Sequence, residues 1–246
     1  FFDTRGIWSA RAPTRKMSEP TVLYEDEHYL ALDKPTGLLI HTDGRSDAPT
    51  LVDWLLRERP TIRGVGETQR LLDGTTIERP GIVHRLDRET SGIVLVDKTA
   101  ESFEHLKSQF QGREVEKLYR AFCYGSMKND RGVIDRPIAR SRKDFRLRSA
   151  QRLARGTQRE AVTHYEVLGR RSDATYLSVA PKTGRTHQIR VHLKAINHPV
   201  VGDALYAPKH SLILGLARLA LHALSVSYTT LAGERVTVEA PMPADF

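Results

Sequence analysis

The sequence contains a single cysteine, Cys123, among its 246 residues. One cysteine cannot form a disulfide within the chain, it excludes a cysteine-rich zinc site, and it is typical of a protein in a reducing compartment. No run of about 18 or more apolar residues is present, so the sequence predicts no transmembrane helix. Residues 1–18 are polar and lack the apolar core of a secretory signal. We therefore expect a cytoplasmic protein with a poorly ordered tail at 1–19 and one domain at 20–246.

Acidic residues are also scarce relative to basic ones. Lys and Arg number 38 against 30 Asp and Glu, which leaves a formal net charge of +8. A polyanion partner such as RNA would explain this excess, because phosphate contacts draw on Lys and Arg. Cations concentrate in the segment 139–159, which is either a solvated loop or a nucleic-acid arm.

What the chain has in quantity is short apolar runs separated by turn residues. The hydrophobic content of 39% is enough for a packed core. The patterns predict strands at 21–24, 29–32, 92–96, 115–125, 161–168, 174–180, 219–228 and 235–240. They predict helices that begin after Thr50, after Thr99 and near residue 186, with a long loop at 59–81. Strands outnumber helices and hairpins dominate, so we expect an α+β fold with a largely antiparallel sheet.

One acidic side chain lies in an unusual setting at the start of the strand at 92–96. Asp87 stands between Arg85 and Arg88, ahead of the turn Thr90-Ser91-Gly92. Nearby positive charge favours the ionised form of a carboxyl group, and an ionised Asp at a strand end can act as a nucleophile or a general base. The alternative is a surface ion pair, which contributes little to stability or function.

Two other segments carry candidate chemistry. Tyr119 lies in a predicted strand between Lys117 and Arg120, either as a packing residue or as a ring that stacks on a base and transfers a proton. The segment 181–193 has four cations, two histidines and no acid. As a helix from Thr186 it would place His187, Arg190 and Lys194 opposite an apolar stripe. Lys182, Arg185 and the amides at the helix start could then hold phosphate.

Several kinds of site are not predicted. His187 and His192 are five residues apart and have no carboxylate nearby, so they do not form a zinc site. The glycine pair Gly64 and Gly66 does not follow a strand, which argues against a nucleotide-binding loop. Ser91 lacks the surroundings of a hydrolase nucleophile. Any chemistry must therefore use Asp, Tyr and Arg without a cofactor.

The motifs resemble, in order and spacing, those of the RluA-type pseudouridine synthases, enzymes that isomerise uridine in RNA. Three blocks carry most of the resemblance: His84-Arg85-Leu86-Asp87-x-x-Thr90-Ser91-Gly92, Lys117-x-Tyr119-x-Ala121-x-x-x-Gly125, and Gly184-Arg185-Thr186-His187-Gln188-Ile189-Arg190-Val191-His192. Weaker blocks are Lys34-Pro35-x-Gly37-Leu38, Gly202-Asp203-x-x-Tyr206 and Leu221-His222-Ala223. The resemblance extends from about residue 20 to Phe246.

The resemblance implies an α+β catalytic domain in two sheet-based halves, with the active cleft between them. It implies that Asp87 is the nucleophile, that Tyr119 stacks on the target base and takes the C5 proton, and that Arg190 pairs with the Asp87 carboxylate. Arg85 would enter the RNA and keep the target nucleotide flipped out. The remaining residues expected to contact RNA are His84, Lys34, Lys182, Arg185 and His187.

The expected substrate is tRNA or 23S rRNA, and the expected product is pseudouridine at specific positions. Many members of the family carry an N-terminal S4-type RNA-binding domain, whereas this chain resembles the members that lack one. RNA affinity would then come from the catalytic domain and its segment 139–159. We expect a monomer without metal or nucleotide cofactor. A non-catalytic RNA-binding or ribosome-assembly protein on the same fold is the alternative hypothesis.

Overall fold

The computed structural model describes residues 19–42, 48–70, 74, 76–142, 144, 146–151 and 154–246. The tail at 1–19, which the sequence predicts to be poorly ordered, lies outside the described residues except for residue 19. The helices are α1 (Leu51–Glu58), α2 (Ala100–Gly112), α3 (Gln188–Ala195) and a short 3₁₀ turn η1 (Pro60–Ile62). The strands are β1 (Thr21–Glu25), β2 (Tyr29–Lys34), β3 (Gly66–Arg70), β4 (Thr76–Pro80), β5 (Ser91–Asp97), β6 (Glu116–Tyr124), β7 (Arg131–Asp135), β8 (Ile138–Arg140), β9 (Arg148–Ser149), β10 (Arg155–Arg159), β11 (Val162–Arg170), β12 (Ala174–Pro181), β13 (Leu221–Thr229) and β14 (Arg235–Glu239).

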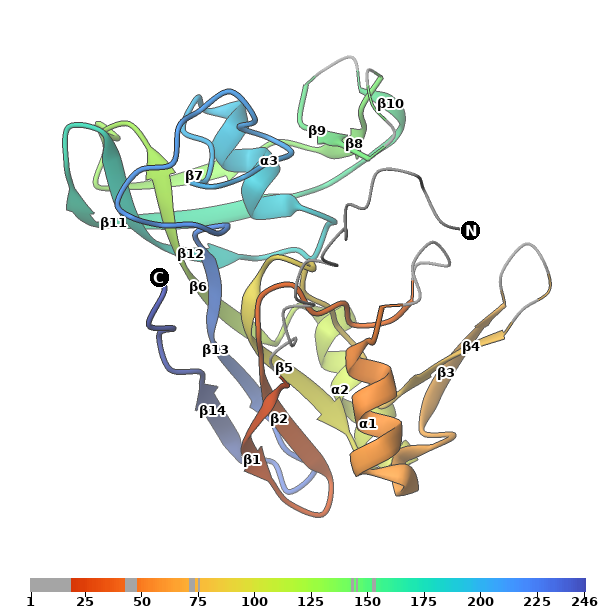
Figure 1. Ribbon diagram of the computed structural model, residues 1–246. Helices are drawn as coiled ribbons and strands as arrows, with labels where there is room; N and C mark the ends of the chain where they lie inside the picture. Colours follow the sequence, from red (N-terminus) through yellow and green to blue (C-terminus); the bar gives the residue numbers. More distant parts are fainter. Residues whose placement is uncertain are drawn as a thin grey trace, which may run out of the picture.

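A nine-stranded sheet runs through the molecule and confirms the predicted α+β class (Figure 1). Its order is β1-β2-β5-β13-β6-β12-β11-β7, with β14 paired to β13. Within this sheet only β5 and β13 pair in parallel. The central strand β13 joins a half made of β1, β2 and β5 to a half made of β6, β12, β11 and β7.

Each half has its own apolar core. One core gathers Leu30, Leu95 and Leu106 with Tyr228, all fully buried, under α1 and α2. The other gathers Leu177, Leu193 and Val200 beneath α3. Tyr119 packs against both cores, so it lies where the two halves meet.

The first two helices begin where the sequence predicts. Thr50 and Thr99 are N-caps whose side chains accept hydrogen bonds from the backbone of the third helical residue. Phe103 and Leu106 form the buried face of α2. The third helix differs from the prediction: it begins at Gln188 rather than Thr186, because His187 adopts a left-handed conformation at φ 56°. None of the described helices is long and apolar enough to cross a membrane.

Two segments expected to be irregular contain strands. The predicted loop at 59–81 holds the antiparallel hairpin β3–β4, and 138–159 forms the small sheet β10-β8-β9. Both project from the main sheet, in Figure 1 toward the right. The prediction of a loop was wrong for Gly66–Arg70 and Thr76–Pro80. Neither segment has the apolar alternation that predicts a half-buried strand. The strand β10 is exposed throughout, whereas Ile138 and Ala139 of β8 are buried.

Candidate active site

A cleft of about 610 Å³ opens at the junction of the two halves. Its walls come from the Asp87 loop, from β6 and α2, and from the loop that leads into α3. It is lined by all of the predicted site residues except one: His84, Arg85, Asp87, Tyr119, Lys182, Arg185, His187 and Arg190. Segments about a hundred residues apart in sequence thus meet at one site.

Asp87, Arg190 and Asp203 form a chain of charges at the cleft. Arg190 donates from Nη1 to Oδ2 of Asp87 at 3.1 Å. Its other edge donates to the Asp203 carboxylate, from Nε at 2.7 Å and from Nη2 at 2.8 Å. The Arg190 side chain is 3% exposed and that of Asp203 is fully buried, whereas that of Asp87 is 17% exposed. The buried Asp203 carboxylate holds the Arg190 guanidinium in place, and Asp87 keeps access to the cleft.

Burial alone lowers the pKa of Arg190, but its hydrogen bonds to Asp203 and the charges of Asp203 and Asp87 raise that pKa overall. The guanidinium is therefore a permanent cation beside Asp87. The predicted pairing of Arg190 with Asp87 is present. Although the sequence pattern places Arg190 opposite the apolar stripe of its helix, the side chain is buried, because Asp203 draws it into the protein interior.

The two arginines next to Asp87 in sequence make other contacts. Arg85 is exposed and lies 3.4 Å from Nε2 of His41 through Nη1. Arg88 donates from Nε to the carbonyl of Gly37 at 3.1 Å. Neither guanidinium forms an ion pair with Asp87 in the described part of the chain. Their proximity in sequence therefore gave the wrong partner for the carboxylate.

Lys34 holds the backbone of the Asp87 loop from below. Its ammonium donates to the carbonyls of Pro35, Leu38 and Arg88 at 3.0, 2.9 and 3.2 Å. The residue is fully buried, and burial lowers its pKa to about 7 against the opposing charges of Asp87 and Glu89. All three hydrogens are used inside the protein. The expected contact of Lys34 with RNA does not fit this position, so Lys34 is a support for the loop instead.

Tyr119 presents its side chain to the same cleft as Asp87. Burial, and then the negative charge of Asp87, raise the pKa of its hydroxyl above the ordinary value. The phenol is therefore neutral in the free protein at physiological pH. A neutral aromatic ring beside a carboxylate is a suitable surface for stacking a base.

His187 and Tyr206 form the wall behind Asp87. Nε2 of His187 lies 3.9 Å from Oδ1 of Asp87, and its Nδ1 is hydrogen-bonded to the Tyr206 hydroxyl at 2.8 Å. Burial lowers the pKa of His187 despite the attraction of Asp87. The Arg190 guanidinium lies 5.2 Å from the centre of the Tyr206 ring. Tyr206 therefore packs against the Arg190 guanidinium and also holds the His187 ring through its hydroxyl group.

The remaining residues that were predicted to contact RNA differ in exposure and in their hydrogen bonds to the protein. Lys182 is exposed, whereas Arg185 is half-buried and donates from Nε to the carbonyl of Glu160 at 2.9 Å. The amide of Arg185 donates to the Gln188 side chain, so it is not free for phosphate. His84 accepts from the Leu95 amide and stacks on Phe110, and burial lowers its pKa to about 3. It is therefore a neutral wall residue.

No group of three or more His, Cys, Asp or Glu side chains with the geometry of a metal site occurs among the described residues. Around Asp87 the cleft presents the paired guanidinium of Arg190 and the phenol of Tyr119, and the exposed cations Arg85 and Lys182 line it as well. This set can place a negative group beneath a sugar ring and stack its base without an added ligand.

The sequence of the chain matches the profile of a family described as RNA pseudouridylate synthase over residues 28–195. The chain belongs to this family. The match includes Asp87, Tyr119 and Arg190, and the RluA-type resemblance seen in the motifs agrees with it.

Curated relatives have the same family name. An uncharacterized RNA pseudouridine synthase of Synechocystis sp. is 39% identical over 92% of this chain and 66% of that protein. The ribosomal large subunit pseudouridine synthase D of Pseudomonas aeruginosa is 36% identical over 99% of this chain and 73% of that protein. The chain thus spans about two thirds of the length of the Synechocystis relative.

A solved structure shares the fold. The human RNA pseudouridylate synthase domain containing 1 superposes with a TM-score of 0.70 at 25% identity, covering 92% of this chain and 84% of that one. The nine-stranded sheet with its central cleft is therefore the family's fold.

Sequence reasoning did not assign a role to Asp203 or Tyr206. Both stand in the weaker block Gly202-Asp203-x-x-Tyr206, so their presence was noticed but not their function. Asp203 also accepts from the amides of Leu205 and Tyr206 at 3.0 Å each, an arrangement typical of an Asp at the start of a turn. That local pattern was the one available signal.

Proposed function

We propose that this protein isomerises uridine in RNA to pseudouridine, with Asp87 as the nucleophile. An Asp87 oxygen bonds to C1′ as the N1–C1′ bond of the target nucleotide breaks, and the electron pair of that bond leaves with the uracil. The detached uracil turns in the cleft, C5 bonds to C1′, and the bond between Asp87 and C1′ breaks, which returns the free carboxylate. The hydrogen on C5 then leaves as a proton and N1 takes one up, so the atoms balance without an added reactant.

The position of Asp87 carries the proposal. One of its oxygens is bound by Arg190, and the other forms no hydrogen bond with the described residues and lies 3.9 Å from Nε2 of His187. The carboxylate is held in direction by a guanidinium that Asp203 immobilises. A fixed anion with one free oxygen is suited to attack at the sugar and to stabilise positive charge that develops there.

The other cleft residues fit the remaining steps. Tyr119 supports the uracil ring from β6. Because its hydroxyl is neutral, we propose that it relays the C5 proton: it takes up the proton from C5 as it passes its own hydrogen to water. Arg85 is exposed and, among the described residues, its hydrogen-bond contact is the long one to His41, so we propose that it can move toward RNA. We propose that it occupies the space left by the flipped nucleotide.

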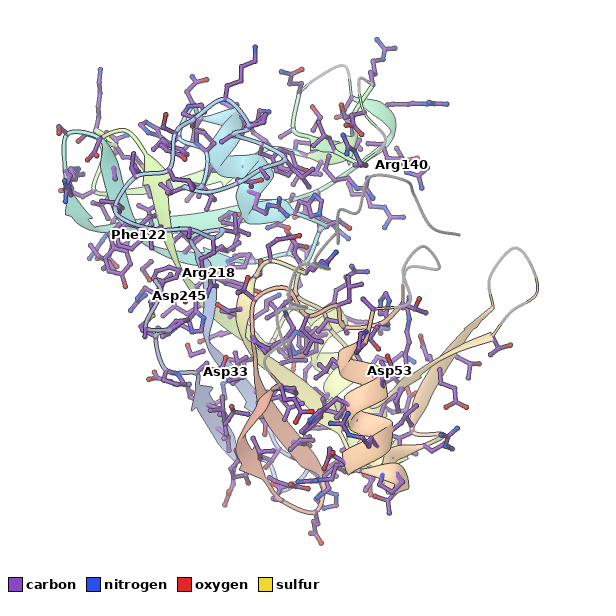
Figure 2. All side chains as sticks on the ribbon, viewed as in Figure 1. Asp33, Asp53, Phe122, Arg140, Arg218 and Asp245 are labelled. Carbon is purple, nitrogen blue, oxygen red and sulfur yellow. The ribbon has the colours of Figure 1, made fainter. Side chains whose placement is uncertain are left out.

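The RNA strand has a basic surface available beside the cleft. A second hollow of about 470 Å³ shares Gly184, Arg185 and Thr186 with the cleft wall. Its other lining residues include Arg140, Arg148, Arg155 and Arg159 from the small sheet β10-β8-β9. Figure 2 shows Arg140 on this projecting sheet. We propose that phosphates flanking the target uridine bind here, together with Lys182 and Arg185.

Large-subunit ribosomal RNA is the substrate class we propose, because several curated relatives are named for it. Transfer RNA is the other class to be tested. Mapping pseudouridine in the RNA of a host strain that lacks the gene identifies the position. We also propose that the protein works in the cytoplasm and as a monomer, which light scattering of the purified chain tests.

Asp87→Asn tests the reaction. RNA labelled with tritium at uridine C5 releases tritium when C5 bonds to C1′, so release measures isomerisation directly. We expect no release by Asp87→Asn and unchanged RNA binding, because the amide keeps the shape of the side chain and loses its charge. Asp130→Asn, the same change at an exposed residue on the far side of the fold, is the control. Binding by the wild type without any release, with every RNA tested, would establish a binding protein instead.

Tyr119→Phe separates the two roles of the tyrosine. The ring remains and the hydroxyl is lost, so we expect RNA binding to persist and kcat to fall by about 100-fold or more. A kcat equal to that of the wild type would show that another group takes the proton.

A further inference from the structure

A second hydrogen-bonded group lies behind the cleft and does not contact it. Ser91 at the start of β5 and His222 at the start of β13 face each other across the parallel pairing of these strands. The Ser91 hydroxyl and Nδ1 of His222 are 2.8 Å apart, and both residues are buried. Nη2 of Arg218 donates to the same hydroxyl oxygen. None of the three lines the cleft, although Thr90 does.

The direction of these hydrogen bonds follows from the donors available. A guanidinium only donates, so the Ser91 oxygen accepts from Arg218. We assign the Ser91 hydrogen to the bond with His222, so that Nδ1 of the ring accepts it. Burial lowers the pKa of His222 to about 4, so the ring is neutral at physiological pH and has one unprotonated nitrogen for this bond. The group is therefore a fixed sequence from Arg218 to Ser91 to His222.

Arg218 is anchored on its other side as well. Its Nη1 donates to Asp245 at 3.0 Å, and its guanidinium lies 6.0 Å from the centre of the Phe246 ring. Figure 2 shows Arg218 beside Asp245, near the carboxyl-terminal end of the chain. The Arg218 side chain is only 9% exposed. An anchored donor of this kind restricts the Ser91 hydroxyl to one rotamer.

This group fixes the start of β5, and the turn that contains Asp87 leads directly into that strand. The amide of Thr90 donates to the carbonyl of Asp87 at 3.2 Å, which closes the turn between Asp87 and Ser91. The next residue, Gly92, has φ +112°, and a Cβ added there would lie 2.2 Å from the Ala223 carbonyl oxygen. The start of β5 therefore lies directly against β13, and a shift of either strand end moves the turn.

We propose that Arg218, Ser91 and His222 are positioning residues that set the place of Asp87 through this turn. The inference rests on the proposed function, since it concerns the rate of that reaction. Lys34 supports the loop through the Arg88 carbonyl, and the Arg218 group fixes its other end at Ser91. The Asp87 oxygen must reach the sugar carbon closely, and a displacement of about 1 Å can reduce a rate by about 100-fold.

The test compares variants that keep or remove each hydrogen bond, by tritium release from C5-labelled RNA. Ser91→Ala and His222→Leu remove the central bond, and we expect kcat to fall by about 10- to 100-fold with KM and RNA affinity unchanged. His222→Asn places an oxygen close to the position of Nδ1 and keeps an acceptor, so we expect it to recover most of kcat. The matched control is Ser227→Ala. Ser227 lies on β13, the same strand as His222, and the change removes its hydrogen bond to Thr237 of β14, so it should leave kcat unchanged.

Three results would overturn the inference: a wild-type kcat in folded Ser91→Ala, a change in KM alone, or equal losses in His222→Asn and His222→Leu. If the substitutions at Ser91 and His222 prevent folding, Arg218→Gln decides, because it leaves the Ser91–His222 pair in place. We expect that variant to lose about 10-fold in kcat, and an unchanged kcat would refute the proposal. An inactive wild type would instead refute the proposed function, so the two failures are distinguishable.

Discussion

Replacing Asp203 by Asn removes one charge from the interior and leaves Arg190 with Asp87 as its remaining partner. The carboxylate of Asp203 accepts two hydrogen bonds from Arg190, at 2.7 and 2.8 Å, and two from the backbone amides of Leu205 and Tyr206. An Asn side chain has a single oxygen, and its amide group would face guanidinium hydrogens. At least one hydrogen bond to a charged group is lost, and a buried cation loses its nearest counter-charge.

The size of the effect follows from burial. Removing one partner of a buried ion pair costs about 3–5 kcal/mol of the free energy of unfolding. Asp87 remains 3.1 Å from Arg190, so we expect the lower end, about 3 kcal/mol. For a chain of this size that corresponds to a fall in Tm of about 6–12 °C. The freed edge of Arg190 can then turn to Asp87, so we also expect kcat to fall by about 10-fold or more.

Thermal unfolding followed by circular dichroism measures the first effect and tritium release measures the second. Asp97→Asn is the matched control, because Asp97 is equally buried but forms no ion pair in the described part of the chain. We expect a much smaller change in Tm for Asp97→Asn at pH 7. A Tm and a kcat of Asp203→Asn that match the wild type would refute the idea that Asp203 immobilises Arg190.

Two further predictions concern pH and salt. Burial raises the pKa of Asp97 to about 8, so between about pH 4 and pH 8 the folded protein keeps a proton that the unfolded chain has lost. The free energy of unfolding of the wild type relative to Asp97→Asn should therefore fall as the pH rises from 5 to 8 and level off above that. Urea titrations at several pH values measure it, and a difference that rises with pH would contradict the shift. The double variant Arg155→Gln, Arg159→Gln should lower the slope of log affinity for RNA against log salt by about 1.4–1.8, with Arg131→Gln as an exposed control on β7. An unchanged slope would place the RNA elsewhere.

The sequence was most informative where local chemistry decides the structure. Thr99 caps α2 as predicted, and the stripe of Phe103 and Leu106 faces the core. Eight of the nine main-sheet strands were also found, because each contains a run of apolar residues bounded by turn residues. The strand β7 (Arg131–Asp135) and the hairpin β3–β4 were missed, because their sequences carry few apolar residues.

The candidate site shows a different limit. Motifs identified Asp87, Tyr119 and Arg190, and the structure brings all three to one cleft. Whether a lysine is buried depends on which carbonyls converge on it, and Lys34 finds three that no sequence pattern reveals. The sequence also did not reveal the second partner of Arg190. Asp203 comes next to it only because the chain turns back after α3.

The central place of β13 has a consequence for folding. This strand lies between β5 and β6, yet it follows them in the chain by about a hundred residues. During synthesis Asp87, Tyr119 and Arg190 all emerge before the strand that joins their two halves. Contacts between residues so far apart in sequence form slowly, and each half exposes a strand edge until they do. The cleft can therefore be completed only after β13 has been made and inserted.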